Sequence, residues 1–244
     1  MATIHLNMDL GEGIANESLV MQHITSCNVA CGGHYGDDDS MKATLALAKT
    51  FGVLVGAHPS FEDKENFGRV QLVCDESRFR ESVTTQIQAF QKVAAELDIK
   101  MNHVKMHGAL YHATAHQTDF VEWTLLLMQE FYNDVPLVVP YGCLLAERAQ
   151  EVGIQIINEA FADRRYLKNG RLVSRERPDA VITDIPKLVN QLSSMVKLQQ
   201  VQTVEEEFLA IKADLYCIHG DNVEIVSQFE ELKNALNQNG ISIA

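Results

Sequence analysis

The stretch NVACGGHYGDDD, residues 28–39, has the residue types and spacing most suggestive of chemistry. An apolar run ends there in Cys31, two glycines, His34 and the three aspartates at 37–39. Thiol, imidazole and carboxylate groups so close together could form a metal-binding site or line a substrate pocket. Alternatively, the segment is a loop in which Asp38 or Asp39 caps the helix that begins near Ser40. The pattern alone leaves these interpretations open.

The elements that position this stretch follow one pattern along the chain. Short apolar runs alternate with longer amphipathic stretches, which is typical of repeated strand and helix units. Helical faces are predicted from Met41 to Gly52, from Phe79 to Leu97 and from Val226 to Leu236. Seven strands are predicted, at residues 4–8, 27–31, 53–57, 103–106, 136–140, 154–158 and 214–218.

One segment breaks the alternation, YLKNGRLV at residues 166–173. Asn169-Gly170 between two short apolar pieces is the usual signal for a two-residue hairpin turn, so a small hairpin insertion is predicted there. The sequence has no linker and no low-complexity segment, which favours a single domain over residues 1–244. Repeated βα units without a boundary predict a seven-stranded parallel βα barrel, and an open doubly wound sheet is the alternative.

Titratable side chains follow six of the seven predicted strands. In a parallel barrel or sheet the carboxyl ends of the strands share one face, and ligands bind at that face. We therefore expect residues that are distant in sequence to converge there, although any single one could be structural. The side chains concerned are Asp9, Glu12, His34, Asp37, His58, His107, Glu159, Asp163, Arg164, His219 and Asp221.

Composition argues against several classes of function. The chain has 20 Lys and Arg residues against 33 Asp and Glu, a formal charge of −13, which disfavours binding to nucleic acid. No apolar run approaches the roughly 20 residues that span a bilayer, and no leader pattern is seen, so a cytoplasmic protein without membrane association is expected. The five cysteines form no paired C-x-x-C pattern and are expected to be reduced, with Cys31 a wall residue.

Seven short motifs occur in order between residues 7 and 221: NMDLGEG, NVACGGHYGD, GAHPSFED, FGR, VKMHGALYH, NEAFADRRY and CIHGD. Together they resemble the successive signatures of the lactam-utilisation proteins, the family of the A component of 5-oxoprolinase. The resemblance implies a seven-stranded βα barrel similar to the glycoside hydrolase and deacetylase superfamily. It also implies one part of a three-subunit, ATP-dependent hydrolase, which works with subunits B and C and opens the lactam 5-oxo-L-proline to L-glutamate.

Opening a lactam requires a base for water, an acid for the leaving nitrogen and donors for the developing oxyanion. Asp9 is the candidate base, unless it holds loop amides, and Glu12 is a second candidate. His107 is the candidate acid, while Lys105 or Arg164 is expected to hold a substrate carboxylate or phosphoryl group. The predicted catalytic set is Asp9, Glu12, Lys105 and His107. The residues predicted to bind substrate are Asn28, His34, Asp37, His58, Asp163, Arg164, His219 and Asp221.

The two cofactors to consider are ATP and a divalent metal ion. The chain has no G-x-x-x-x-G-K-[ST] loop, so the ATP used by the complex is expected to bind on one of the partner subunits. Binding of zinc or another divalent metal is an open alternative, because imidazole and carboxylate groups are suitable ligands. The candidate ligands are Asp9, His34, His58 and His107. A stand-alone metal-dependent deacetylase or amidohydrolase and a non-catalytic small-molecule binding barrel are the alternative functions.

Overall fold

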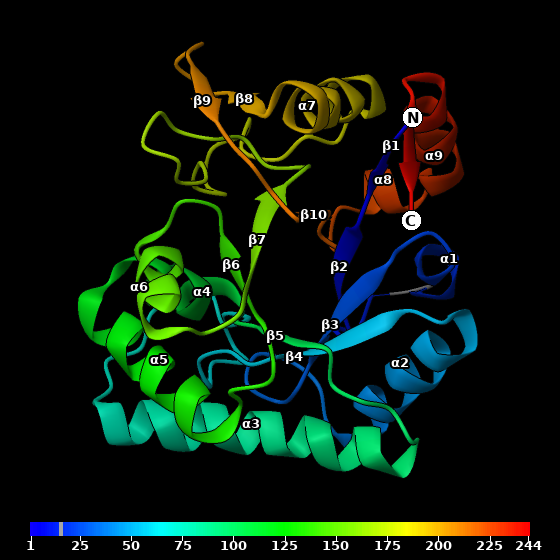
Figure 1. The fold of residues 1–244 in the computed structure, drawn as a ribbon. Helices are drawn as coiled ribbons and strands as arrows, with labels where there is room; N and C mark the ends of the chain where they lie inside the picture. Colours follow the sequence, from blue (N-terminus) through cyan, green and yellow to red (C-terminus); the bar gives the residue numbers. More distant parts are fainter. Residues whose placement is uncertain (15–16) are drawn as a thin grey trace.

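The computed structural model describes residues 1–14 and 17–244, and its centre is a closed parallel barrel. Seven strands form the barrel in the order β10, β2, β3, β4, β5, β6 and β7, with helices outside them (Figure 1). The predicted seven-stranded barrel is confirmed, and the open sheet is excluded. The strands are β2 (Leu6–Leu10), β3 (Ser26–Ala30), β4 (Leu54–His58), β5 (His103–Lys105), β6 (Leu137–Pro140), β7 (Ile156–Phe161) and β10 (Leu215–Cys217).

Two strand boundaries differ from the prediction in a way that matters for the site. The first predicted strand, 4–8, lies at 6–10, and the sixth, 154–158, lies at 156–161. Asp9 and Glu159 were expected just after strands but are strand residues whose side chains are buried. The predicted strands ended too early because charged residues were expected to lie outside them. These two acids lie inside the strands because they have polar partners within the barrel.

The helices surround the barrel, and helix α2 shows how the sequence sets their bounds. The side chain of Asp37 accepts a hydrogen bond from the backbone nitrogen of Ser40 at the start of α2, and Gly52 ends it with a φ of 70°. The helices are α1 (Glu17–Met21), α2 (Asp38–Phe51), α3 (Glu76–Glu96), α4 (Gly108–His116), α5 (Thr118–Phe131), α6 (Leu144–Val152), α7 (Ile185–Leu198), α8 (Val223–Val226) and α9 (Phe229–Gln238).

The last predicted helix, from Val226 to Leu236, is two helices in the structure. The side chains of Ser227 and Gln228 both donate to the backbone carbonyl of Glu224, at 3.1 and 2.9 Å. Such side-chain bonds compete with the regular helical ladder, which accounts for the break between α8 and α9. Within the described residues, none of the helices combines the length and the hydrophobicity needed to cross a membrane.

Two short sheets outside the barrel were not predicted. Strand β1 (Ala2–Ile4) pairs in parallel with β11 (Ile241–Ile243), and β8 (Gln200–Gln202) pairs antiparallel with β9 (Phe208–Ala210). Strands of three residues are too short to show a clear alternation of polar and apolar residues.

The segment predicted as a hairpin carries an antiparallel bridge between Tyr166 and Leu172. The backbone nitrogen of Leu167 donates to the carbonyl oxygen of Arg171 at 2.8 Å, and Gly170 has a φ of 81°. These features are those of a tight turn. That the whole chain forms a single domain stays a prediction.

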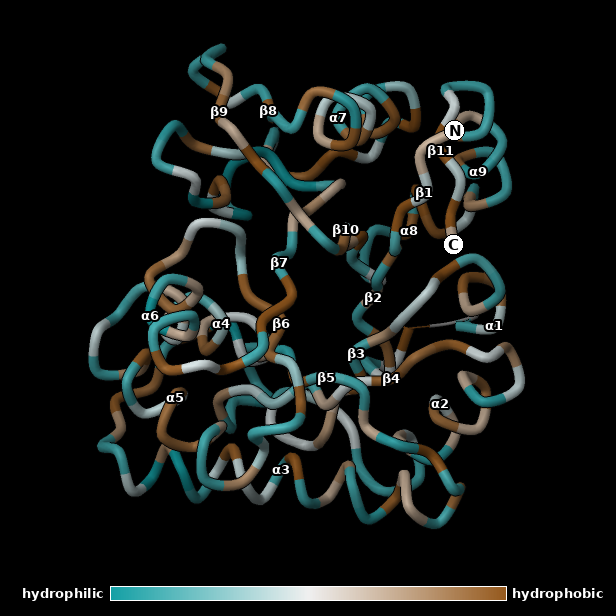
Figure 2. Tube along the Cα trace, in the orientation of Figure 1, coloured by the Kyte–Doolittle hydropathy of each residue, from teal (hydrophilic) through white to brown (hydrophobic). Residues whose placement is uncertain are grey.

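The apolar core lies between the barrel and the helices, where residues such as Leu45, Phe90 and Leu127 are fully buried. Figure 2 shows hydrophobic and hydrophilic residues alternating along the trace of α3, as expected for a helix with one face toward the barrel.

A polar layer crosses the barrel interior beneath the mouth. Asp9, Asn28, Gly56 and His103 are register neighbours on four successive strands. The side-chain Nδ2 of Asn28 donates to Oδ1 of Asp9 at 2.6 Å, and its Oδ1 lies 2.6 Å from Nε2 of His103. A Cβ atom on Gly56 would lie 2.3 Å from the His103 ring, so only glycine lets the ring reach Asn28. This layer supports Asp9 from below.

Candidate active site

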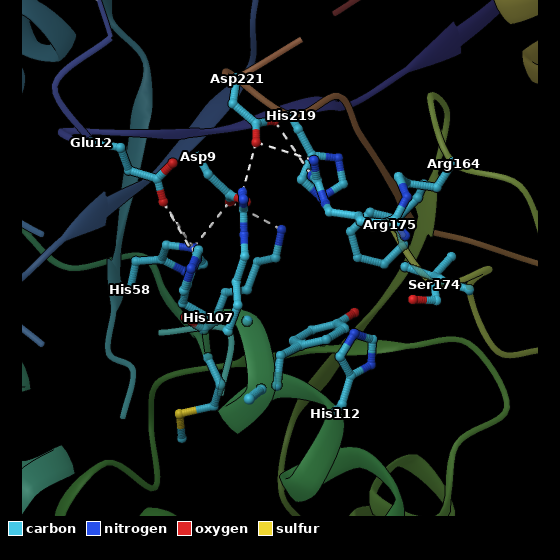
Figure 3. A pocket seen from close by; sticks show the side chains of 18 of the residues that line it. Asp9, Glu12, His58, His107, His112, Arg164, Ser174, Arg175, His219 and Asp221 are labelled. Carbon is cyan, nitrogen blue, oxygen red and sulfur yellow. Dashed lines mark hydrogen bonds and ion pairs between the residues drawn. The ribbon is translucent and has the colours of Figure 1, made fainter. Parts of the chain in front are cut away.

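A cavity of about 530 Å³ opens at the carboxyl ends of the barrel strands. Figure 3 shows Asp9, Glu12, His58 and His107 together on one side of it, with His219, Arg164 and Arg175 on another. The predicted strand ends therefore do converge. The predicted site residues that line the cavity are Asp9, Glu12, His58, Lys105, His107, Arg164, His219 and Asp221.

Asp9, on β2, is held through one of its two carboxylate oxygens. Oδ1 accepts hydrogen bonds from Nδ2 of Asn28 at 2.6 Å and Nζ of Lys105 at 3.1 Å, and it lies 3.4 Å from Nε2 of His58. Within residues 1–14 and 17–244, no comparable contact reaches Oδ2. Because Asp9 lines the cavity, Oδ2 is the oxygen available to a bound water or substrate.

Lys105, on β5, places an ammonium group between two buried carboxylates. Its Nζ lies 3.1 Å from Oδ1 of Asp9 and 2.8 Å from Oε1 of Glu159. The hydroxyl of Tyr111 donates to Oε2 of Glu159 at 2.7 Å. Glu159 and Tyr111 had no role in the chemistry predicted from the sequence. The sequence feature that could have identified Glu159 is Lys105, a lysine inside another buried strand, because a buried ammonium group requires a carboxylate partner.

The charges of Asp9 and Lys105 stabilise each other. Burial acts to raise the pKa of Asp9, but the Lys105 ammonium together with the neighbouring His58 and His219 outweighs it and holds that pKa well below its usual value. Burial acts to lower the pKa of Lys105, but Asp9 and Glu159 hold it well above its usual value. Both groups are therefore ionised at neutral pH. Lys105 is already paired twice, so the structure does not favour its predicted role of holding a substrate carboxylate.

A compact buried cluster of one glutamate and three histidines lies beside Asp9: Glu12, His34, His58 and His107. Oε1 of Glu12 lies 2.9 Å from Nε2 of His34, 3.4 Å from Nδ1 of His107 and 3.8 Å from Nε2 of His58. One ligand atom from each residue lies within 4.8 Å of the others, so this group could hold a metal ion. The carboxylate in this cluster is Glu12 and not Asp9, the acid expected from the sequence.

Burial shifts the protonation of the cluster. It lowers the pKa of His34 to about 3 and that of His107 well below its usual value, with repulsion from His58 adding to both shifts. Burial also raises the pKa of Glu12 well above its usual value, and the nearby charge of Asp9 adds to the effect. The rings of His34 and His107 are therefore neutral at physiological pH.

Both ring nitrogens of His107 are engaged. Nδ1 lies 3.0 Å from Nε2 of His58, and Nε2 lies 3.0 Å from the carbonyl oxygen of Phe67. A general acid needs a ring nitrogen that can reach the substrate. The structure therefore does not favour the predicted role of His107 as the acid for the leaving nitrogen.

His219, after β10, has a ring that is oriented by the buried carboxylate of Asp163. Nδ1 of His219 lies 2.9 Å from Oδ1 of Asp163, and Oδ2 accepts hydrogen bonds from the His219 backbone nitrogen and from Nδ2 of Asn222, each at 3.1 Å. Burial acts to raise the pKa of Asp163, but these contacts with His219 and Asn222 hold it below its usual value. Asp163 thus fixes the ring, and Nε2 is left for the cavity.

Arginines make another part of the wall cationic. Arg69 and Arg175 both pair with Oδ2 of Asp221, at 2.7 and 3.1 Å. Arg164 is only 5% exposed and donates to two backbone carbonyls, and in the described chain no carboxylate forms an ion pair with it. Burial, and then repulsion from Arg175, lower the pKa of Arg164 to about 10, so the guanidinium stays charged at neutral pH. Among the residues that the structure describes, it is therefore a buried cation without a carboxylate in an ion pair.

The remaining predicted residues lie around the cavity or outside it. Asn28 belongs to the polar layer under Asp9, and His34 stands in the histidine cluster behind the wall. The structure does not bring Asp37 to the cavity. Its side chain is exposed and caps α2, because Ser40 completes a reciprocal capping pair with it. Cys31 is a buried wall residue, as expected, and burial raises its thiol pKa to about 12.

Comparison with known proteins agrees with this geometry. The model of the LamB/YcsF family matches residues 4–244. The chain belongs to the LamB/YcsF family. A relative from Neisseria meningitidis serogroup A, named as the A component of 5-oxoprolinase, is 35% identical over 244 residues, all of both chains. Another of that name, from Limosilactobacillus fermentum, is 40% identical over 248 residues, covering 100% of this chain and 99% of the relative.

A solved structure extends the likeness to three dimensions. The lactam utilization protein from Thermus thermophilus is 31% identical, with a TM-score of 0.89. The match covers 99% of this chain and 98% of that chain. The family resemblance predicted from the motifs is thereby confirmed, and the LamB/YcsF barrel is shared along nearly the whole chain.

Proposed function

We propose that this chain is the hydrolytic subunit of an ATP-dependent 5-oxoprolinase and opens the lactam 5-oxo-L-proline to L-glutamate. The relatives named as the A component of 5-oxoprolinase, which match the full chain, support this function. One observation supports it most directly: Oδ2 of Asp9 and the guanidinium of Arg164, neither of which has an ionic partner within residues 1–14 and 17–244, belong to the same cavity. A lactam with a carboxylate needs both, a carboxylate to activate water and a cation to bind the acid group.

Arg164 binds the carboxylate of the substrate in this proposal. A guanidinium group presents a planar fork of N–H donors that matches a carboxylate, and a buried site strengthens the interaction. The described residues give Arg164 no acid of its own, so binding a carboxylate breaks no existing ion pair. Arg175, which lines the same cavity, adds a second positive charge near the bound acid group.

Asp9 and His219 carry the proton transfers. Oδ2 of Asp9 takes a proton from a water molecule, and the water oxygen attacks the lactam carbonyl carbon. The ring C–N bond then breaks, and the protonated ring of His219 gives its Nε2 proton to the leaving nitrogen. Asp163 stabilises this protonated ring, as the carboxylate of a catalytic triad does. The products are the carboxylate and the amine of glutamate.

ATP is proposed to act on partner subunits. An unactivated lactam is resonance-stabilised and resists attack by water, so the partner subunits are proposed first to transfer the terminal phosphoryl group of ATP to the lactam oxygen, releasing ADP. Ring opening then leaves an acyl phosphate, whose hydrolysis releases phosphate and the carboxylate of glutamate. The sequence carries no phosphate-binding loop of the Walker type, which supports ATP binding by subunits B and C. We place the complex in the cytoplasm, where ATP and the amino acid product are both used.

Reconstitution tests the proposal. The purified chain is mixed with subunits B and C, ATP, magnesium and 5-oxo-L-proline, and glutamate is measured. We expect glutamate only from the complete mixture, and at least about 100-fold less from Asp9→Asn. The exposed residue Asp134 gives the matched control, Asp134→Asn, with an unchanged rate. No glutamate from the complete wild-type mixture would refute the substrate, and a wild-type rate for Asp9→Asn would refute the role of Asp9.

A further inference from the structure

We infer that the buried cluster beside Asp9 binds a divalent transition-metal ion of the zinc class through Glu12, His34, His58 and His107. The inference goes beyond the proposed function, because an ion can be bound or absent whatever lactam is opened. Each ligand comes from the end of a different barrel strand, β2, β3, β4 or β5, and all are buried. Their ligand atoms lie within 4.8 Å of one another.

The spacing of the ligand atoms fits one ion. Zinc bonds of about 2.0–2.1 Å in a tetrahedron place neighbouring ligand atoms roughly 3.3–3.4 Å apart. Oε1 of Glu12 lies 2.9, 3.4 and 3.8 Å from the nearest nitrogens of His34, His107 and His58. The facing nitrogens of His58 and His107 are 3.0 Å apart. These separations fall on both sides of the tetrahedral edge, but the rings of His34 and His107 stack with an interplanar angle of 3°, so they have to rotate for both nitrogens to point at one ion.

The hydrogen bonds on the outer sides of His58 and His107 decide which nitrogens face the cluster with lone pairs. Nδ1 of His58 lies 2.7 Å from the carbonyl oxygen of Lys105, and Nε2 of His107 lies 3.0 Å from that of Phe67. A carbonyl oxygen can only accept, so each outer nitrogen carries the proton. When each ring carries only that proton, the inner nitrogens, Nε2 of His58 and Nδ1 of His107, present their lone pairs to each other.

Two lone pairs therefore face each other across 3.0 Å in a buried site. Neither ring can donate to the other, and a positive charge between them is needed to remove the repulsion. A metal ion satisfies both nitrogens at once and also the carboxylate of Glu12. Histidine ligands of metals are usually held in this way, with the second ring nitrogen donating to a backbone carbonyl. A single proton shared by His58 and His107 is the competing occupant.

The backbone that holds His107 is itself fixed in an unusual conformation. Phe67 has a φ of 56°, which is rare for a residue other than glycine, and it directs its carbonyl oxygen to His107. Gly68 packs on the rings so closely that a Cβ atom there would lie 2.9 Å from Cβ of His34 and 3.0 Å from Cδ2 of His107. A Cβ on Gly108 would meet the Gly68 carbonyl oxygen at 2.5 Å. The loop therefore presses against the two rings.

The ligand types select the class of ion. Three imidazoles and one carboxylate suit zinc, cobalt, nickel or iron, whereas magnesium and calcium prefer oxygen ligands throughout. Asp9 stays outside the set, because it is not among the four residues whose ligand atoms lie within 4.8 Å of one another. An ion held here would supply Lewis acidity beside that carboxylate.

Metal binding is measured directly, without an activity assay. The purified full chain is stripped with a chelator, titrated with cobalt or zinc, and its metal content is determined by mass spectrometry. We expect one equivalent of metal and the strong visible absorption of four-coordinate cobalt. Glu12→Gln keeps the shape of the site and should weaken binding at least about 100-fold, because losing a ligand costs more than losing an outer-shell partner. His107→Ala should do the same.

His112 supplies the matched control, because it lines the same cavity but lies outside the cluster. His112→Ala should keep one equivalent of cobalt and the same spectrum. Circular dichroism confirms that each variant is folded. If His107→Ala fails to fold, the test rests on Glu12→Gln. The inference is overturned if the wild-type chain binds no cobalt or zinc, if Glu12→Gln binds as tightly as wild type, or if proton NMR shows a shared His58–His107 proton with excess zinc present.

Discussion

The Nζ atom of Lys105 lies 3.1 Å from Oδ1 of Asp9, and these two residues are only 2% and 5% exposed. Lys105 also pairs with the buried Glu159 at 2.8 Å. One cation thus contacts two carboxylates inside the barrel, and because it binds Oδ1 of Asp9, Oδ2 has no partner among the described residues. The pair therefore links the stability of the barrel to the chemistry at its mouth.

Lys105→Met should destabilise the protein by about 3–5 kcal/mol, because it leaves two buried carboxylates without their cation. Urea unfolding followed by circular dichroism measures the loss. The control is Lys42→Met, since the ion pair of Lys42 with Glu96 is about half exposed and should contribute less than about 1 kcal/mol. Equal losses in the two variants would show that the Lys105 network contributes no more than a surface pair.

Asp163→Asn should lower kcat of the reconstituted enzyme by about 100-fold with little change in KM, because the ring of His219 loses the carboxylate that orients it. His219→Gln should lower kcat at least as much. The double variant should be no slower than His219→Gln alone, since both changes remove one unit. Multiplied effects in the double variant would show that Asp163 acts independently of His219.

The sequence could predict which face carries the site. Parallel strands deliver their carboxyl ends to one face, so the motifs around Asp9, His58 and His219 had to meet once the barrel was recognised. The capping role of Asp37 was harder to foresee. A local pattern of glycines and aspartates fits a pocket and a helix start equally well, and only the bond between Asp37 and Ser40 separates them.

Contacts across the barrel could not be predicted from single segments. Glu12, and not Asp9, belongs to the clustered ligand atoms, while Oδ1 of Asp9 is held by Lys105 and Asn28, which come from other strands. Glu159 was expected after its strand because it is charged, yet its partners lie inside the barrel. Sequence periodicity reports which side of a strand is buried, but it does not report which buried groups meet.

Arg164→Gln should raise KM for 5-oxo-L-proline by about 100-fold with a smaller effect on kcat, because a charge-assisted contact to the substrate carboxylate is lost in ground state and transition state alike. Steady-state kinetics on the reconstituted enzyme measure both constants. Arg177→Gln, at an exposed ion pair with Asp179, should leave them unchanged. An unchanged KM in folded Arg164→Gln would place the carboxylate elsewhere in the cavity.

The stability of the protein should fall below about pH 6.5, in part because of His103. Burial lowers the pKa of this ring to about 3, so it stays neutral in the folded protein while the unfolded chain takes up a proton near pH 6.5. The unfolded state then binds more protons than the folded state. The contribution of His103 to stability is therefore fully present above about pH 6.5 and decreases as the pH falls toward 3.

His103→Gln tests this pH dependence. Between about pH 7 and pH 5, the free energy of unfolding of the variant should decrease by about 2 kcal/mol less than that of wild type, as measured by urea unfolding at both pH values. His5→Gln, at an exposed histidine, should keep the wild-type dependence. A His103→Gln variant that loses as much stability as wild type would show that His103 is protonated in the folded protein.

The close packing of Gly108 on the carbonyl of Gly68 has an evolutionary consequence. A side chain at Gly108 would meet that carbonyl oxygen at 2.5 Å, and one at Gly68 would press on His34 and His107. Neither position can vary unless the loop before α3 and the turn into α4 move together. We therefore expect both glycines to be kept in descendants of this barrel that have lost or changed their substrate. The packing around the histidine cluster requires them whatever the substrate is.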